Sequence, residues 1–179
     1  MGDGGMCFTG DEQLAEALRS IRVHGKGNHK YDNARVGVNG QLDTIQAAIL
    51  LAKFSIFPEE VKLRQNSAER YTELLSQCPN LTSPEIPEGY ASVWAQYSIL
   101  SNGVKREDLQ QALKKQGIPT AIYYPKPLHL QTAFKDLGYK HGDFPISEDA
   151  SERIFSIPMH PYLTPEDQEN VVNVIKTVW

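Results

Sequence analysis

The chain has 179 residues, of which 40% are hydrophobic and 22% charged, so it carries enough apolar side chains to build a folded core. Its 18 lysines and arginines stand against 22 aspartates and glutamates, and the net charge of −4 with no basic block argues against a nucleic-acid partner. The longest apolar run, residues 47–52, is far shorter than the roughly 20 residues that cross a bilayer, which argues against a membrane protein.

The first part of the chain predicts one strand followed by two helices. Residues 4–9 follow a glycine-rich turn at 2–5 and are expected to form a short buried strand. A helix is expected over residues 11–24, and a flexible, cationic loop over 25–30. The apolar residues expected to face inward from this helix are Leu14, Ala17, Leu18 and Ile21.

A second helix is expected to open near Gly40, directly after a polar loop. Asn39 would then be the N-cap residue of this helix, where an amide side chain bonds free backbone N–H groups. A helix N-terminus with an amide donor is also suited to binding an anion, so capping and anion binding both remain open for Asn39. The residues expected to be buried along one stripe of this helix are Leu42, Ile45, Ile49 and Ala52.

A long charged helix over about 58–77 comes next and suits a connector between two lobes, and prolines mark residues 78–89 as a loop or boundary. After it the pattern predicts a strand at 93–100, a helix at 106–116 closed by Gly117, and a second strand at 118–124.

The last part of the chain predicts two more helices. Ser147 is expected to cap a helix that runs through Phe155. Residues 156–161 should form a short extended segment between prolines. Thr164 is expected to cap the final helix, with Pro165 at its first position, where the missing N–H costs nothing.

Few side chains suggest metal or acyl-transfer chemistry. The two cysteines, Cys7 and Cys78, are too few for a disulfide framework or a zinc site and fit a reducing cytoplasm. The five histidines show no zinc-ligand spacing, and the serines lack the context of a catalytic nucleophile. We therefore expect no metal site.

Three segments together resemble one enzyme family. They are the turn at 2–5, the loop and helix start at 37–48, and the proline-stiffened turn Tyr123–His129. The chain is similar to the C-terminal half of the pyridoxal-phosphate (PLP) sugar-nucleotide aminotransferases of the DegT–DnrJ–StrS type. Residues 92–97 and 157–163 look most like the members that aminate UDP-linked 3-keto hexuronates.

The resemblance implies an α/β fold of type I PLP-dependent aminotransferases. Residues 1–77 would be the end of the large cofactor domain with its connecting helix, and residues 78–179 the small domain. It also implies a cytoplasmic homodimer with active sites at the interface. Glutamate would be the amino donor and a nucleotide-linked keto sugar the acceptor, in amino-sugar or surface-polysaccharide synthesis.

The resemblance also assigns individual residues. Asn39 would reach across the dimer interface to the phosphate of the partner's cofactor. Gln41 stands where the family usually has an arginine directed at the substrate, and it supplies no charge. Tyr123, Tyr124 and His129 would contact the nucleotide diphosphate and the sugar, although many relatives have histidine at the position of Tyr123.

One family residue has no counterpart. The lysine that forms the Schiff base in the family lies just before the Gly-Asp-Gly-Gly turn, upstream of Met1. We therefore expect no catalytic residue in this chain and no activity from it alone. A non-catalytic module that dimerises or binds a nucleotide sugar is the alternative.

Overall fold

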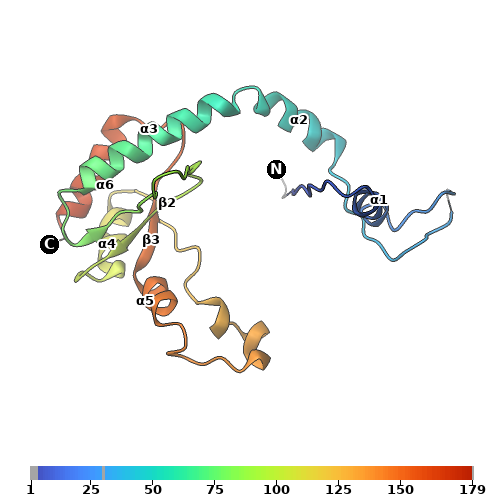
Figure 1. Ribbon diagram of the computed structural model, residues 1–179. Coiled ribbons are helices and arrows are strands. Elements are labelled where there is room, and N and C mark those ends of the chain that lie inside the picture. Colours follow the sequence, from blue (N-terminus) through green and yellow to red (C-terminus); the bar gives the residue numbers. More distant parts are fainter. Residues whose placement is uncertain (1–3, 30, 179) are drawn as a thin grey trace. The chain divides into compact units, whose positions relative to one another are not determined.

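The structure, a computed structural model, describes residues 4–29 and 31–178, so Gly2 and Asp3 of the predicted turn lie outside it. The chain forms two compact units, Met1–Phe57 and Pro58–Trp179 (Figure 1), and each is described here by itself.

The first unit contains two helices, α1 (Glu12–Ile21) and α2 (Thr44–Phe54). Asp11 caps α1, because its carboxylate accepts hydrogen bonds from the N–H groups of Gln13 at 2.8 Å and Leu14 at 3.1 Å. The sequence predicts that this helix ends at His24, but α1 ends earlier, at Ile21. His24 has a φ of 58°, which is left-handed and cannot continue a helix.

The predicted strand at residues 4–9 is wrong. These residues are exposed and form no strand. A strand needs a neighbouring strand to pair its backbone N–H and C=O groups, and the described residues of the first unit supply none.

The segment between α1 and α2 is a hydrogen-bonded hairpin, and the loop predicted over residues 25–30 falls within it, with Lys30 outside the described residues. The N–H of His24 donates to the carbonyl of Val38 at 2.9 Å, and the N–H of Gly40 donates to the carbonyl of Arg22 at 2.8 Å. Bridges between Val23 and Asn39 and between Lys26 and Asn33 continue the pairing. This pairing leaves residues 38–40 extended.

Helix α2 therefore begins at Thr44 and not near Gly40, with Asp43 at its N-cap position. Asn39 is not a capping residue, because its backbone belongs to the hairpin. The predicted buried stripe is also wrong, since none of the residues of α2 is buried. Amphipathic spacing predicts which side of a helix is apolar, but it cannot supply the surface that covers it.

The second unit packs helices against a three-stranded antiparallel sheet (Figure 1). Strand β2 (Tyr97–Ser101) lies between β1 (Leu81–Thr82) and β3 (Ile154–Ile157), with Ile99 opposite Phe155. The long helix α3 (Phe57–Leu75) begins at the boundary of the two units. The remaining helices are α4 (Arg106–Lys115), α5 (Pro145–Arg153) and α6 (Pro165–Lys176), with the short 3-10 helices η1 (Leu128–Leu130) and η2 (Thr132–Leu137).

The core of this unit joins the sheet to three helices. Helix α4 packs on α6, and the buried Gln168 of α6 donates a hydrogen bond of 2.7 Å to the carbonyl of Ser67 in α3. The most deeply buried large side chains include Tyr71, Tyr97, Ile99, Leu109, Leu113, Phe155, Val172 and Ile175. Because α3 belongs to the second unit, the chain divides at the start of this helix. The assignment of residues 1–77 and 78–179 to a large and a small domain stays a prediction.

Two element predictions in this unit are wrong. The expected strand at 118–124 is reduced to one bridge, Ala121 with Ser156, because Pro119 cannot donate to a ladder. Ser147 caps nothing: α5 begins at Pro145, and Phe155 lies in β3 instead of in the helix. The helix predicted at 106–116 is confirmed, and Gly117 follows it with a φ of 72°.

The start of α6 is confirmed in detail, with Thr164 as the cap of a reciprocal capping box. The Thr164 hydroxyl accepts from the N–H of Asp167 at 3.1 Å, and the Asp167 carboxylate accepts from the N–H of Thr164 at 3.3 Å.

Replacing Thr164 by alanine should lower the free energy of unfolding of the second unit by about 1 kcal/mol, because the N–H of Asp167 loses its partner. Urea titration followed by tryptophan fluorescence measures the change. Thr164→Ser keeps the hydroxyl and should recover most of the loss. Equal destabilisation by both substitutions would show that the cap is not the cause.

Candidate functional site

Asn39, at the end of the hairpin, and Gln41, between the hairpin and α2, lie in the first unit, and both are exposed. The side chain of Asn39 forms no hydrogen bond with another residue of the described ranges, so both its donors and its acceptor are free for an external group. Asn39 is not at a helix N-terminus, so any anion contact must come from the amide itself.

Tyr123, Tyr124 and His129 lie in the second unit: the two tyrosines are on the segment between the Ala121 bridge and η1, and His129 lies in η1. Tyr124 is 77% exposed and Tyr123 51% exposed. Tyr123 borders a cavity of about 180 Å³ whose wall also includes Gln96 and Met159. The two tyrosines therefore present their rings to the outside, where a ligand can reach them.

His129 is held differently, because its side chain is only 8% exposed and faces an acid. Its Nε2 lies 2.8 Å from Oε1 of Glu148, and its ring packs on Phe144 with centroids 4.7 Å apart. The structure therefore joins the turn that carries Tyr124 to the start of α5.

Glu148 is the acid at the centre of this cluster, and only 7% of it is exposed. Burial opposes ionisation of its carboxyl, but the N–H of Gly142, the His129 side chain and the N–H of Phe144 all bond to it and lower its pKa below the ordinary value. Glu148 therefore stays ionised at neutral pH.

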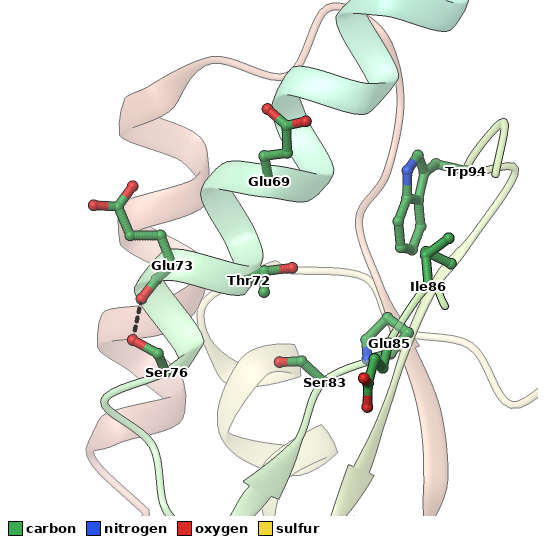
Figure 2. A pocket seen from close by; sticks show the side chains of 9 residues that line it. Glu69, Thr72, Glu73, Ser76, Ser83, Glu85, Ile86 and Trp94 are labelled. Atoms are coloured by element: carbon green, nitrogen blue, oxygen red, sulfur yellow. Dashed lines mark hydrogen bonds between the residues drawn. The ribbon is translucent and has the colours of Figure 1, made fainter. Parts of the chain in front are cut away.

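A separate cavity of about 610 Å³ lies between α3 and residues 83–94 (Figure 2). Glu69 and Glu73 line it from α3, and Glu85, Ile86 and Trp94 line it from the other side. Three carboxylates make this cavity unfavourable for an anionic phosphate group. None of the site residues predicted from the sequence lines it.

The described residues show no sign of a metal centre or a membrane span. Within residues 4–29 and 31–178, no group of three His, Cys, Asp or Glu side chains is arranged to hold an ion. No helix in these ranges has the length and apolar character that a bilayer crossing requires.

Comparison with known proteins identifies the family. Residues 1–176 match the DegT/DnrJ/EryC1/StrS aminotransferase family. The chain belongs to this family.

The relatives agree with this family in sequence and in fold. The UDP-2-acetamido-2-deoxy-3-oxo-D-glucuronate aminotransferase of Pseudomonas aeruginosa is 45% identical over 162 residues, which cover 90% of this chain and 43% of that protein. The pleiotropic regulatory protein of Geobacillus stearothermophilus is 44% identical over 97% of this chain and 46% of its own length. The crystal structure of a DegT DnrJ EryC1 StrS aminotransferase from Brucella abortus superposes with a TM-score of 0.85 at 49% identity, covering 95% of this chain and 44% of that one.

These values confirm the α/β aminotransferase fold. They also show that the chain spans less than half the length of these three DegT/DnrJ/EryC1/StrS proteins.

The described lysines do not include a shielded amine of the kind that covalent catalysis in this aminotransferase family needs. Nine of them are exposed, and the partly exposed Lys176 bonds to Gln77 at 3.1 Å. A nucleophilic lysine can be activated by desolvation, which the exposed positions do not provide. The nine exposed lysines are Lys26, Lys53, Lys62, Lys105, Lys114, Lys115, Lys126, Lys135 and Lys140.

Sequence reasoning missed Glu148. The residue lies on a charged helix, where a carboxylate is usually solvated, and its contacts come from residues 129, 141, 142 and 144. The available signal was Pro145 at the helix start with an acid in the first turn, which marks a carboxylate that can fold back onto free N–H groups.

Proposed function

We propose that this chain forms part of a PLP-dependent aminotransferase that moves an amino group from glutamate to a nucleotide-linked keto sugar, in amino-sugar or surface-polysaccharide synthesis. The observation that carries the proposal is the 45% identity over 162 residues to an aminotransferase named for UDP-2-acetamido-2-deoxy-3-oxo-D-glucuronate. A UDP-linked 2-acetamido-3-keto sugar is accordingly the proposed substrate class. Both cysteines are free, which fits a reducing cytoplasm.

The residues of this chain fit one side of a cofactor site. The free amide of Asn39 can donate to a phosphate oxygen, and a hydrogen bond to a charged group of this kind is stronger than a neutral one. PLP would supply the electron sink that makes amino transfer possible. The lysine that attaches PLP would come from outside the described residues, because all lysines within them are exposed or bonded at the surface.

The sugar side would be formed by the turn before α5. Tyr123 and Tyr124 would contact the nucleotide sugar with their exposed rings and hydroxyls, and His129 would do so through Nδ1, the ring nitrogen not bonded to Glu148. Gln41 would offer hydrogen bonds to the substrate but no charge, so it should hold an anionic sugar more weakly than an arginine would.

A homodimer with shared sites is part of the proposal. Helix α2 has no buried residue although it is largely apolar, with Ile45, Leu51 and Phe54 each more than 70% exposed. An apolar surface of this kind marks an interface in soluble proteins. Asn39 and Gln41 lie just before this helix and would serve the active site of the partner.

Asn39→Ala tests the proposal in a chain joined to the N-terminal half of a family member. PLP affinity should fall roughly 10- to 100-fold, because one hydrogen bond to a charged phosphate is lost, worth about 1.5–3 kcal/mol. Fluorescence titration with PLP measures the change. Asn173→Ala, an exposed asparagine on α6, is the matched control and should leave PLP affinity unchanged.

Gln41→Arg should act differently from Asn39→Ala: it should tighten binding of the anionic sugar nucleotide and have little effect on PLP affinity.

In a hybrid dimer with Asn39→Ala in one chain, PLP should be lost from the site of the other chain. Unchanged PLP affinity in the Asn39→Ala protein would refute the phosphate contact. Loss from the mutated chain's own site would refute the arrangement across the dimer.

A second candidate is a non-catalytic module that dimerises or binds a nucleotide sugar. The exposure of the described lysines favours it, because residues 4–29 and 31–178 then offer no shielded lysine to hold PLP covalently. Incubation of the chain with PLP followed by borohydride reduction and mass spectrometry tests this second candidate. Stoichiometric labelling of one lysine would contradict the non-catalytic module.

A further inference from the structure

The carboxylate of Glu148 ties three segments together at the edge of the proposed sugar site. Its Oε1 accepts from Nε2 of His129 at 2.8 Å, and both its oxygens lie 2.9 Å from the N–H of Gly142. The N–H of Phe144 donates to Oε1 at 3.3 Å, and Nδ1 of the exposed His141 lies 3.3 Å from Oε2. A buried carboxylate with this many donors is fully satisfied and has one orientation.

This arrangement decides which nitrogen of His129 carries the proton. An ionised carboxylate only accepts hydrogen bonds, so a ring nitrogen 2.8 Å from it must be protonated. In the neutral imidazole that nitrogen is Nε2, and Nδ1 then has a free lone pair. The hydrogen bond made by one ring nitrogen sets the chemistry of the other.

The ring of His129 is fixed, yet its second nitrogen is not enclosed. Phe144 packs on the imidazole, and Tyr139 packs edge-on against Phe144 with centroids 5.1 Å apart. Nδ1 has no hydrogen-bond partner among the described residues. The completely buried side-chain atoms without a partner in these residues are Arg70 Nε and Tyr71 OH, so Nδ1 keeps some exposed surface. Nδ1 is therefore the ring nitrogen that has no partner and is not completely buried, in a side chain that is 8% exposed.

We propose that Glu148 is a positioning residue: in the neutral imidazole of His129 it selects the Nε2–H tautomer, so that Nδ1 presents a hydrogen-bond acceptor to a hydroxyl or amide N–H of the nucleotide sugar. This inference rests on the proposed function for its ligand. The tautomer itself is a property of this chain and is testable without cofactor or turnover.

The first experiment reads the tautomer directly. The chain is labelled with ¹⁵N-histidine and its ring nitrogens are followed by NMR at a pH where the imidazoles are neutral, with His129→Gln used for assignment. Nδ1 of His129 should show the unprotonated shift in the unaltered chain. Glu148→Ala should give a mixture of tautomers, because every contact of the carboxylate is lost.

Two further variants show whether the acceptor matters or only the stability of the segment. Glu148→Gln can keep an oxygen at the Oε1 position beside His129, so the tautomer should be retained. Glu152→Ala, at an exposed position on the same helix, should leave it unchanged. Protonated Nδ1 in the unaltered chain would overturn the inference even if Glu148→Ala did not fold. The same tautomer in a folded Glu148→Ala chain would also overturn it.

The second experiment adds UDP-N-acetylglucosamine as the probe. Binding should shift the Nδ1 resonance of His129, and Glu148→Ala should bind about 2- to 10-fold more weakly, as expected for one hydrogen bond. Equal affinity in both proteins, with no shift of Nδ1, would overturn the positioning role and leave the proposed function standing. No binding to the unaltered chain would overturn the proposed substrate class, and with it the ligand part of this inference.

Discussion

Gly37→Ala should unfold the hairpin between α1 and α2, at a cost of about 3 kcal/mol or more. A Cβ at residue 37 would lie 2.1 Å from the backbone N of Gly25 and 2.5 Å from the carbonyl O of Ile21. These are backbone atoms held by the hairpin hydrogen bonds, including the 2.8 Å bond from the N–H of Val38 to Ile21, so they cannot move aside cheaply.

Hydrogen exchange measures this effect at the amides of His24, Val38 and Gly40, which should lose their protection in Gly37→Ala. Gly10→Ala is the control, because a Cβ there meets no atom within 4 Å. In the chain joined to the N-terminal half of a family member, Gly37→Ala should also weaken PLP binding, since the hairpin sets the position of Asn39. Retained protection in Gly37→Ala would mean that the hairpin tolerates the extra methyl group.

Phe155→Ala should lower the free energy of unfolding of the second unit by about 3–5 kcal/mol, the range for removing a large aromatic side chain from a core. Phe155 is 1% exposed and lies on β3 opposite Ile99, which is 0% exposed. The loss should be large because the space left behind is bounded by the sheet and the helices, which cannot collapse fully into it.

Urea unfolding followed by tryptophan fluorescence gives the magnitude, because the buried Trp94 belongs to the core of the second unit. Phe134→Ala is the matched control: Phe134 lies in η2 of the same unit and is 42% exposed, so its removal should cost markedly less. Equal losses for the two variants would show that Phe155 is not part of the core.

Local chemistry made several elements predictable. The apolar spacing of Leu109 and Leu113 with Gly117 behind them predicted α4, and Thr164 followed by Pro165 predicted the start of α6. These signals lie within one or two turns of the chain, so they act on the backbone without help from distant residues. The resemblance through residues 37–48 and 123–129 similarly indicated the family from the sequence.

The failures have a common physical cause, which is pairing between residues distant in the sequence. The sequence predicts Asn39 as a helix cap, but hydrogen bonds between residues 38–40 and residues 21–24 keep its backbone extended. The helix predicted from Ser147 to Phe155 stops at Arg153 because residues 154–157 pair with β2, more than 50 residues away.

The sequence by itself determined the family and the order of most helices, because these depend on local spacing and on motifs, and by resemblance it predicted which residues would face a ligand. Only the tertiary structure decided how those residues are held. It placed His129 against the buried Glu148 and left Asn39 with a free amide, because hydrogen bonds and burial arise between segments that the chain brings together only on folding.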